Sequence, residues 1–354
     1  MLWDEPKIFF LERRYFFSII LSEFLKNRVA LQQRGAAAGG KPAENRGVYA
    51  GDTAAGGGLR PDGGRIGGDM ARAEGGNGMN ALEIHGLTKK RGEFALQGLE
   101  LTLPAGCIMG LIGENGAGKS TTIRLILNSL GRDGGTVAVY ERDNRALTAL
   151  EREDIGVVLD EVGLPEYMNA AQIGRMLAGI FRRWQPEVYE EYLHRLELPE
   201  DKAFKDYSRG MRMKLGLAAA LSHQPRLLLL DEATSGLDPV VRDDILTIFA
   251  DFTRDEDHAV LISSHIVSDL EKICDYIAFL HKGRLLLCEE KDRLTEEYGI
   301  LRGEAEGLDP AAVCGHRNTP YGTEYLVRRG VVPAGLALGQ VNIEDLFVFM
   351  AKEA

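Results

Sequence analysis

A glycine-rich loop between an apolar run and a helical stretch constrains this chain most. Its sequence from Gly113 to Ser120, GENGAGKS, fits the pattern G-x-x-x-x-G-K-[ST]. The apolar run Ile108–Ile112 precedes the loop, and the helical stretch spans residues 121–130. Glycines let backbone N–H groups surround phosphates, and a helix N-terminus adds partial positive charge. We therefore predict a phosphate-binding loop in an α/β fold. A chance glycine-rich turn is the alternative, and the flanking strand and helix argue against it.

The residue types in this loop predict individual roles. We expect Lys119 to reach the β- and γ-phosphates and the Ser120 hydroxyl to bind Mg²⁺. The residues expected to contact the phosphates are Gly113, Glu114, Asn115, Gly116, Ala117, Gly118, Lys119, Ser120 and Thr121.

An acidic pair follows a second apolar run. Residues 227–230 are four leucines, and Asp231 and Glu232 come directly after them. Open α/β sheets bind ligands at the carboxyl ends of their strands. We expect Asp231 to hold Mg²⁺, usually through water, and Glu232 to orient or deprotonate an attacking water. Taken alone, the pair could be a solvated acidic turn, but the phosphate loop favours the catalytic interpretation.

The rest of the chain between residues 79 and 301 alternates strand-like and helical segments, which is typical of a largely parallel sheet covered by helices. The predicted strands are residues 155–159, 227–230, 260–262 and 276–280, and the last forms a hairpin with residues 284–288. The predicted helical stretches include residues 169–198 and 240–254.

Composition separates two flanking regions from this core. Residues 35–78 hold 15 glycines in 44 positions, too little apolar surface to offset the entropy of ordering, so we expect a flexible segment. Residues 1–34 could form an amphipathic helix, and an unattached apolar segment is the favoured alternative. Because regular alternation starts after Met79, residues 1–78 are also hypothesised to be an upstream extension. We predict that residues 302–354 form a small α+β appendage, with strands at 324–327 and 330–332 and a final helix at 342–352.

Charge and cysteine content exclude several classes of protein. Lys and Arg number 42 against 53 Asp and Glu, a net charge of −11 that disfavours a nucleic-acid partner. The four cysteines form no CxxC pair, which argues against a disulfide scaffold or a thiolate metal site. No run approaches the roughly 20 apolar residues of a membrane span. We expect a cytoplasmic protein that meets a membrane only through a partner.

Three further segments give the motifs a recognisable order. The segment YSRGM begins at Tyr207, SGLD begins at Ser235, and His265 follows a predicted strand. Together with GENGAGKST and LLLLDEATSGLDP, these segments resemble the ATP-binding cassette (ABC) family over about residues 82–301. Within that family the chain looks most like the cytoplasmic ATP-binding subunit of a prokaryotic exporter whose permease is a separate polypeptide.

The resemblance implies a fold and a function. It implies a P-loop NTPase of the ABC ATPase type, with a mixed sheet core in residues 79–301 and a helical subdomain at about 164–215. It further implies two cassettes, in a homodimer or a heterodimer, that enclose two ATP–Mg²⁺ and drive an integral membrane permease. On this basis the protein would be peripheral on the inner face of the cell membrane.

The resemblance also implies site residues. Ser208, Arg209, Gly210 and Met211 would be the signature that contacts ATP on the opposite subunit, although Ser208 could equally be a helix cap. Asp238 would lie at the dimer interface. His265 would hydrogen-bond the γ-phosphate and hold water near Glu232. Catalysis would thus rest on Glu232, His265 and Lys119, and metal binding on Ser120, Asp160 and Asp231.

Three departures from the family pattern alter these expectations. The signature usually reads LSGGQ, so Arg209 replaces a glycine and Met211 a glutamine. Asp160 stands where the family has a glutamine, and a carboxylate can ligate Mg²⁺ but cannot donate an amide hydrogen bond. The adenine-stacking aromatic is replaced by Arg91, which could stack through its guanidinium, or Phe94 could substitute.

The sequence also suggests a docking groove for the permease and two alternative functions. Residues 164–168 could receive a permease helix, whereas the apolar residues that follow have the spacing of core positions. A soluble ABC ATPase acting on ribosomes or DNA is disfavoured by the single phosphate loop and by the short spacing to Asp231. A cassette that binds ATP only structurally, in a heterodimer, is disfavoured by the presence of Glu232 and His265.

Overall fold

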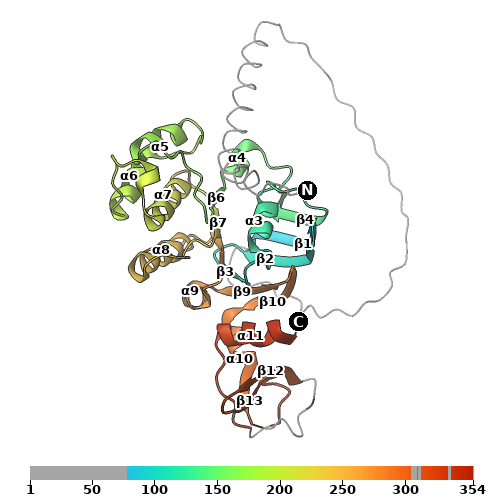
Figure 1. Ribbon diagram of the computed structural model, residues 1–354. Helices are drawn as coiled ribbons and strands as arrows, with labels where there is room; N and C mark the ends of the chain where they lie inside the picture. Colours follow the sequence, from blue (N-terminus) through green and yellow to red (C-terminus); the bar gives the residue numbers. More distant parts are fainter. Residues whose placement is uncertain (1–77, 304–308, 310–311, 334–335, 354) are drawn as a thin grey trace, which may run out of the picture.

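A computed structural model describes residues 78–303, 309, 312–333 and 336–353 (Figure 1). The expectations for residues 1–34 and for the glycine-rich stretch to residue 77 lie outside these ranges. None of the helices in the described ranges combines the length and the apolarity that crossing a membrane requires.

The central sheet has six strands in the order β10-β9-β3-β8-β7-β6, and all but the antiparallel β10 are parallel. Burial explains its apolar sequence, because every residue of β3, β7 and β8 is buried. The strands are β3 (Ile108–Ile112), β6 (Ile155–Val158), β7 (Leu227–Asp231), β8 (Ala259–Ser264), β9 (Tyr276–His281) and β10 (Arg284–Glu290). The predicted strands and the β9–β10 hairpin are confirmed.

A second, antiparallel sheet packs against one face of the first. Its order is β2-β1-β4-β5, and one buried cluster joins its leucines to α3 and the central strands. The elements on this side are β1 (Asn80–Arg91), β2 (Phe94–Pro104), α3 (Lys119–Ile126), β4 (Gly134–Val139), β5 (Arg142–Asp143) and α4 (Ala149–Arg152). Helix α3 is shorter than the predicted stretch 121–130, since Leu127 caps it and Asn128 turns the chain with φ +52°.

A group of helices stands at the far edge, beyond β6 (Figure 1). It contains α5 (Ala170–Ala178), α6 (Pro186–Arg195), a 3-10 turn (Phe204–Asp206) and α7 (Arg209–Leu221). The stretch predicted at 169–198 is two helices, because α5 ends at Gly179 and Pro186 starts a new helix at its first position. Helices α8 (Pro239–Phe252) and α9 (Val267–Ile273) follow β7 and β8 and cover the sheet on the same side as α7.

The C-terminal region forms its own three-stranded antiparallel sheet, in the order β11-β13-β12. Its elements are α10 (Lys291–Glu297), β11 (Tyr298–Arg302), β12 (Val313–Thr319), β13 (Gly322–Arg328) and α11 (Ile343–Glu353). Residues 324–327 form part of β13 as predicted, but the strand predicted at 330–332 is wrong. Those residues form a turn closed by Val331 N to Arg328 O, and Val331 is exposed.

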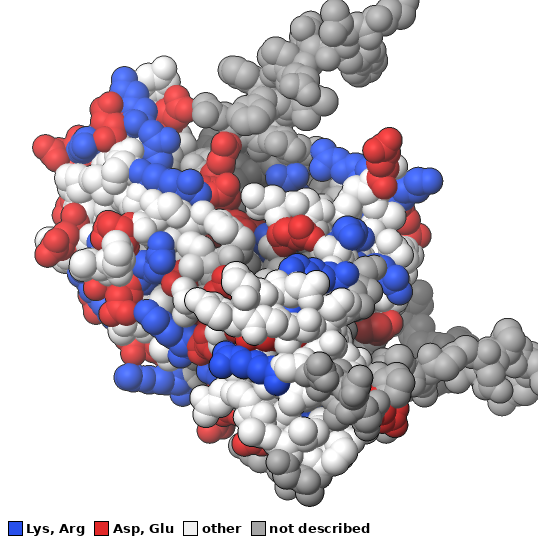
Figure 2. All heavy atoms as spheres, turned by 60° about the horizontal axis from the view of Figure 1, so that its bottom comes forward, with Lys and Arg blue, Asp and Glu red and all other residues white. Residues whose placement is uncertain are grey.

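Charged side chains of both signs are mixed over the face drawn in Figure 2, where Lys and Arg lie among Asp and Glu instead of forming one basic stripe. A continuous basic surface is the electrostatic footprint that nucleic-acid binding requires. This face presents no such footprint.

Candidate functional site

The glycine-rich loop joins β3 to α3 and touches the β1–β2 hairpin. Gly118 has φ +115°, and a Cβ atom there would lie 2.8 Å from Cζ of Phe94, so only glycine fits. Phe94 is half-buried against the loop, and its partner across the hairpin turn is the exposed Arg91. Both residues considered for adenine stacking therefore lie at one hairpin end, and Phe94 contacts the loop.

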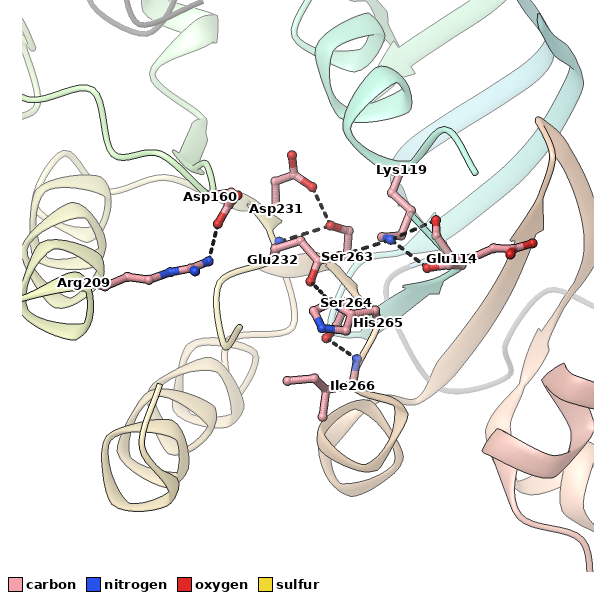
Figure 3. A network of polar contacts seen from close by, with 11 residues as sticks. Glu114, Lys119, Asp160, Arg209, Asp231, Glu232, Ser263, Ser264, His265 and Ile266 are labelled. Carbon is pink, nitrogen blue, oxygen red and sulfur yellow. Dashed lines mark hydrogen bonds and ion pairs between the residues drawn. The ribbon is translucent and has the colours of Figure 1, made fainter. Parts of the chain in front are cut away.

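The Lys119 side chain lies between the loop and the acidic pair. Only 5% of it is exposed, and its Nζ donates to the carbonyl of Gly113 at 2.7 Å. The same Nζ lies 3.1 Å from Oε1 of Glu232 (Figure 3). The cation is thus held at the mouth of the phosphate loop and next to the expected general base.

Asp231 ends β7 as a buried carboxylate. Ser263 Oγ donates to its Oδ1 at 2.6 Å, and the Ser120 hydroxyl bonds to it as well. Burial raises the pKa of Asp231, the two hydroxyl bonds oppose that rise, and the charges of Glu232 and Asp160 add to it. A carboxylate with a neighbouring hydroxyl offers the oxygen ligands that Mg²⁺ prefers, so these residues fit that cation.

Glu232 lies between a histidine and a lysine. Oε2 lies 2.6 Å from Nδ1 of His265, while Oε1 faces Lys119 (Figure 3). The backbone of Glu232 has φ +54°, a costly conformation for this residue, and its N–H bonds to the carbonyl and hydroxyl of Ser263. A carboxylate oriented in this way can accept a proton from a water beside the loop.

The signature segment begins α7. Ser208 is its N-cap and its Oγ accepts from Met211 N at 3.2 Å, so the predicted capping role is observed. A Cβ on Gly210 would lie 3.6 Å from Leu237, which brings the signature beside the SGLD segment. In that segment Asp238 caps α8 through a bond from Val241 N.

The structure brings together two of the departures from the family pattern. Arg209 Nη2 lies 2.5 Å from Asp160 Oδ1, and both side chains are half-exposed (Figure 3). The guanidinium also lies over Gly236, whose Cβ would be 3.1 Å from Nη1. In Figure 3, Arg209 and Lys119 stand on opposite sides of Glu232. The two substitutions therefore offset each other's charge within one chain.

Sequence reasoning missed two residues of this site. Ser263 bonds to the carboxylate of Asp231 and to the backbone N–H of Glu232, yet the sequence did not distinguish it from Ser264, whose hydroxyl instead bonds to Ile266 N. His281, at the end of β9, lies 2.5 Å from the Glu114 carboxylate of the loop. No signal in the sequence links positions so far apart.

Comparison with known proteins adds an independent finding. A family model described as ABC transporter matches residues 96–235. The chain is 37% identical over 280 residues to the uncharacterized ABC transporter ATP-binding protein YhcH of Bacillus subtilis, covering 75% of this chain and 91% of the relative. It is 36% identical over 304 residues to the daunorubicin/doxorubicin resistance ATP-binding protein DrrA of Streptomyces peucetius, covering 76% and 91%. It is 32% identical over 211 residues to the bacitracin transport ATP-binding protein BcrA of Enterococcus faecalis, covering 58% and 68%.

Solved structures agree on the fold. The structure of an ATP-binding subunit of an ABC transporter aligns with TM-score 0.56 at 24% identity, covering 60% of this chain and 91% of that one. A dimeric ATP-binding cassette in a post-hydrolysis state, bound to ADP and Pi, aligns with TM-score 0.54 at 21% identity, covering 59% and 98%. The expected fold class and family are confirmed. The chain belongs to the ABC transporter family, as one of its ATP-binding proteins.

Proposed function

We propose that the protein hydrolyses ATP to ADP and phosphate with Mg²⁺, and that this turnover drives a separate membrane permease. One observation carries the proposal: the Glu232 carboxylate is held between Lys119 and His265, directly beside the phosphate loop. A structural ATP-binding partner would not require a carboxylate placed between a lysine and a histidine at this loop.

The side chains divide the chemistry among them. Bound Mg²⁺ would neutralise charge on the phosphate oxygens. Ser120 and Asp231 would hold it, Asp231 through water, with Asp160 as a third ligand. Lys119 would exchange its loop carbonyls for β- and γ-phosphate oxygens. Glu232 would take the proton of the attacking water.

His265 would complete the hydrolytic site. Its ring reaches Glu232 through Nδ1, and its side chain is half-exposed, so it stands at the surface that a nucleotide would contact. It would hydrogen-bond the γ-phosphate and keep the attacking water near Glu232.

Two cassettes would enclose two nucleotides. The exposed Ser208 stands at the N-terminus of the 13-residue helix α7, where backbone N–H groups and the helix dipole suit a phosphate of the opposite subunit. Arg209, Gly210 and Met211 would complete this surface, and Asp238 would lie across the interface. A dimeric cassette bound to ADP and Pi among the similar folds supports this arrangement. Phe94, in contact with the loop, is the better placed residue to stack on adenine.

The permease would dock on the helical group, on the cytoplasmic side of the membrane. Tyr167 is 80% exposed, and the apolar residues Val162 and Leu164 line a small pocket between the loop after β6 and α7. An exposed aromatic on the helical group offers an apolar contact to a partner helix. Export is the proposed direction, because similar proteins are named for bacitracin transport and for daunorubicin/doxorubicin resistance.

A single substitution tests hydrolysis. We expect Glu232→Gln to lower phosphate release by at least about 100-fold while calorimetry shows retained ATP affinity, since the loop is untouched. Glu190→Gln, an exposed glutamate on α6, is the matched control and should behave as wild type. Equally low phosphate release by the wild type and Glu232→Gln would instead favour a structural ATP-binding role.

A further inference from the structure

The turn between β9 and β10 supports the phosphate loop from behind. The carbonyl of Leu280 approaches Gly113 so closely that a Cβ there could not fit. Beyond it, Gly283 N donates to the carbonyl of Ala117 at 3.0 Å. Backbone contacts at both ends of the loop therefore tie its shape to the end of β9.

His281 lies between these two contacts and is buried. Its side chain is 7% exposed, and its Nδ1 lies 2.5 Å from Oε1 of Glu114. Neither ring nitrogen makes an aligned hydrogen bond with any residue in the described part of the chain. Burying an imidazole without hydrogen bonds is destabilising, so stability alone gives no reason for a histidine here. Its Nδ1 faces a carboxylate of the phosphate loop.

Glu114 is the second residue of that loop. Its carbonyl accepts from Ala117 N at 3.0 Å and from Lys119 Nζ at 3.4 Å, so its backbone helps define the cradle. Its side chain is 55% exposed and carries a negative charge where the loop would surround a triphosphate. Because like charges repel, the direction in which the Glu114 carboxylate points affects how well the loop can hold a triphosphate.

We propose that His281 is a positioning residue of the phosphate loop. The close contact between its ring and the Glu114 carboxylate holds that side chain against the end of β9, which keeps the loop in shape and directs this negative charge away from the nucleotide phosphates. The inference rests on the proposed function, because it assigns His281 a part in nucleotide binding at the same site.

The test is a double-mutant cycle on the full chain, with His281→Ala, Glu114→Ala and the double variant. The measured quantities are KM and kcat for ATP hydrolysis and the calorimetric Kd for ADP with Mg²⁺. We expect His281→Ala to raise KM and Kd about ten-fold with kcat within about two-fold of wild type, since one contact to a charged group is lost. In the Glu114→Ala background the same change should alter Kd by less than about two-fold, because its partner is gone.

Two further variants separate positioning from folding. His281→Asn retains an N–H donor and should recover part of the ADP affinity. If His281→Ala unfolds below the assay temperature, His281→Asn replaces it in the double-mutant cycle. His258→Ala removes a half-buried imidazole that stacks on Phe252 and contacts its carbonyl, remote from the loop, and should leave KM and Kd unchanged.

The opposing results are distinct. Unchanged affinity in His281→Ala, a loss confined to kcat, or an equal loss in both Glu114 backgrounds overturns the inference while the proposed function stands. A wild-type chain that binds neither ADP nor ATP overturns both.

Discussion

The penultimate residue of β8, Ser263, offers the sharpest test of the site. Ser263 is fully buried, and its hydroxyl donates to Asp231 Oδ1 at 2.6 Å and accepts from Glu232 N at 3.2 Å. Ser263→Ala removes both bonds while adding no volume. Its neighbour Ser264 is equally buried, yet its hydroxyl accepts from Ile266 N, so Ser264→Ala is a matched control.

The size of the effect follows from the charge on the acceptor. A hydrogen bond to a charged group contributes about 1.5–3 kcal/mol, which corresponds to roughly ten- to hundred-fold in an equilibrium constant. Burial already raises the pKa of Asp231, and the Ser263 bond counteracts that rise. Its loss raises the pKa further, so less of the carboxylate is ionised. We expect the half-saturating Mg²⁺ concentration to increase at least about ten-fold, and more at pH 6 than at pH 8.

The free energy of unfolding without metal should also show the loss of the Ser263 bond, and the loss should again depend on pH. A carboxyl whose folded pKa lies above its unfolded value of about 3.9 favours folding while protonated. That contribution is present below the unfolded pKa and is lost as pH rises through the folded pKa. Ser263→Ala should therefore lower the free energy of unfolding, relative to wild type, more at pH 7 than below pH 4.

Magnesium titration of nucleotide binding at pH 6 and pH 8 measures the first effect. Urea unfolding at pH 7 and below pH 4 measures the second. A folded Ser263→Ala protein whose Mg²⁺ requirement at pH 7 stays within about two-fold of wild type would refute the reasoning. The same shift in Ser264→Ala would refute it as well, because that serine does not touch the carboxylates.

Three other perturbations follow from the structure. Burial lowers the pKa of His223 to about 4. The free energy of unfolding should therefore fall by up to about 3 kcal/mol as pH drops from about 6.5 to 4. Urea unfolding of His223→Gln should lack this dependence on pH. The half-exposed ion pair of Arg209 and Asp160 should show a coupling free energy of about 0.2–1 kcal/mol in a double-mutant cycle of unfolding. Salt screens a surface ion pair, so a coupling that persists at 1 M salt would contradict this interpretation. Tyr167→Asp should uncouple transport in membrane vesicles while ATP binding persists, and transport equal to wild type would refute the docking groove.

The sequence alone determined the parts of the site that are local. The loop from Gly113 to Ser120 stands between its strand and helix, and Asp231 ends a buried strand, because phosphate cradles and apolar strands are encoded by adjacent residues. Boundaries were less secure: the stretch at 169–198 divides at Pro186, and residues 330–332 form a turn although they are apolar.

Only the tertiary structure decided which distant side chains meet. The strand order places β8 between β3 and β7, and this order alone brings Ser263 to Asp231 and His265 to Glu232. The order of strands also sets β9 behind the loop, where His281 reaches Glu114. Contacts across many intervening residues leave no periodic or compositional trace in one chain, so they become visible only when the sheet is assembled.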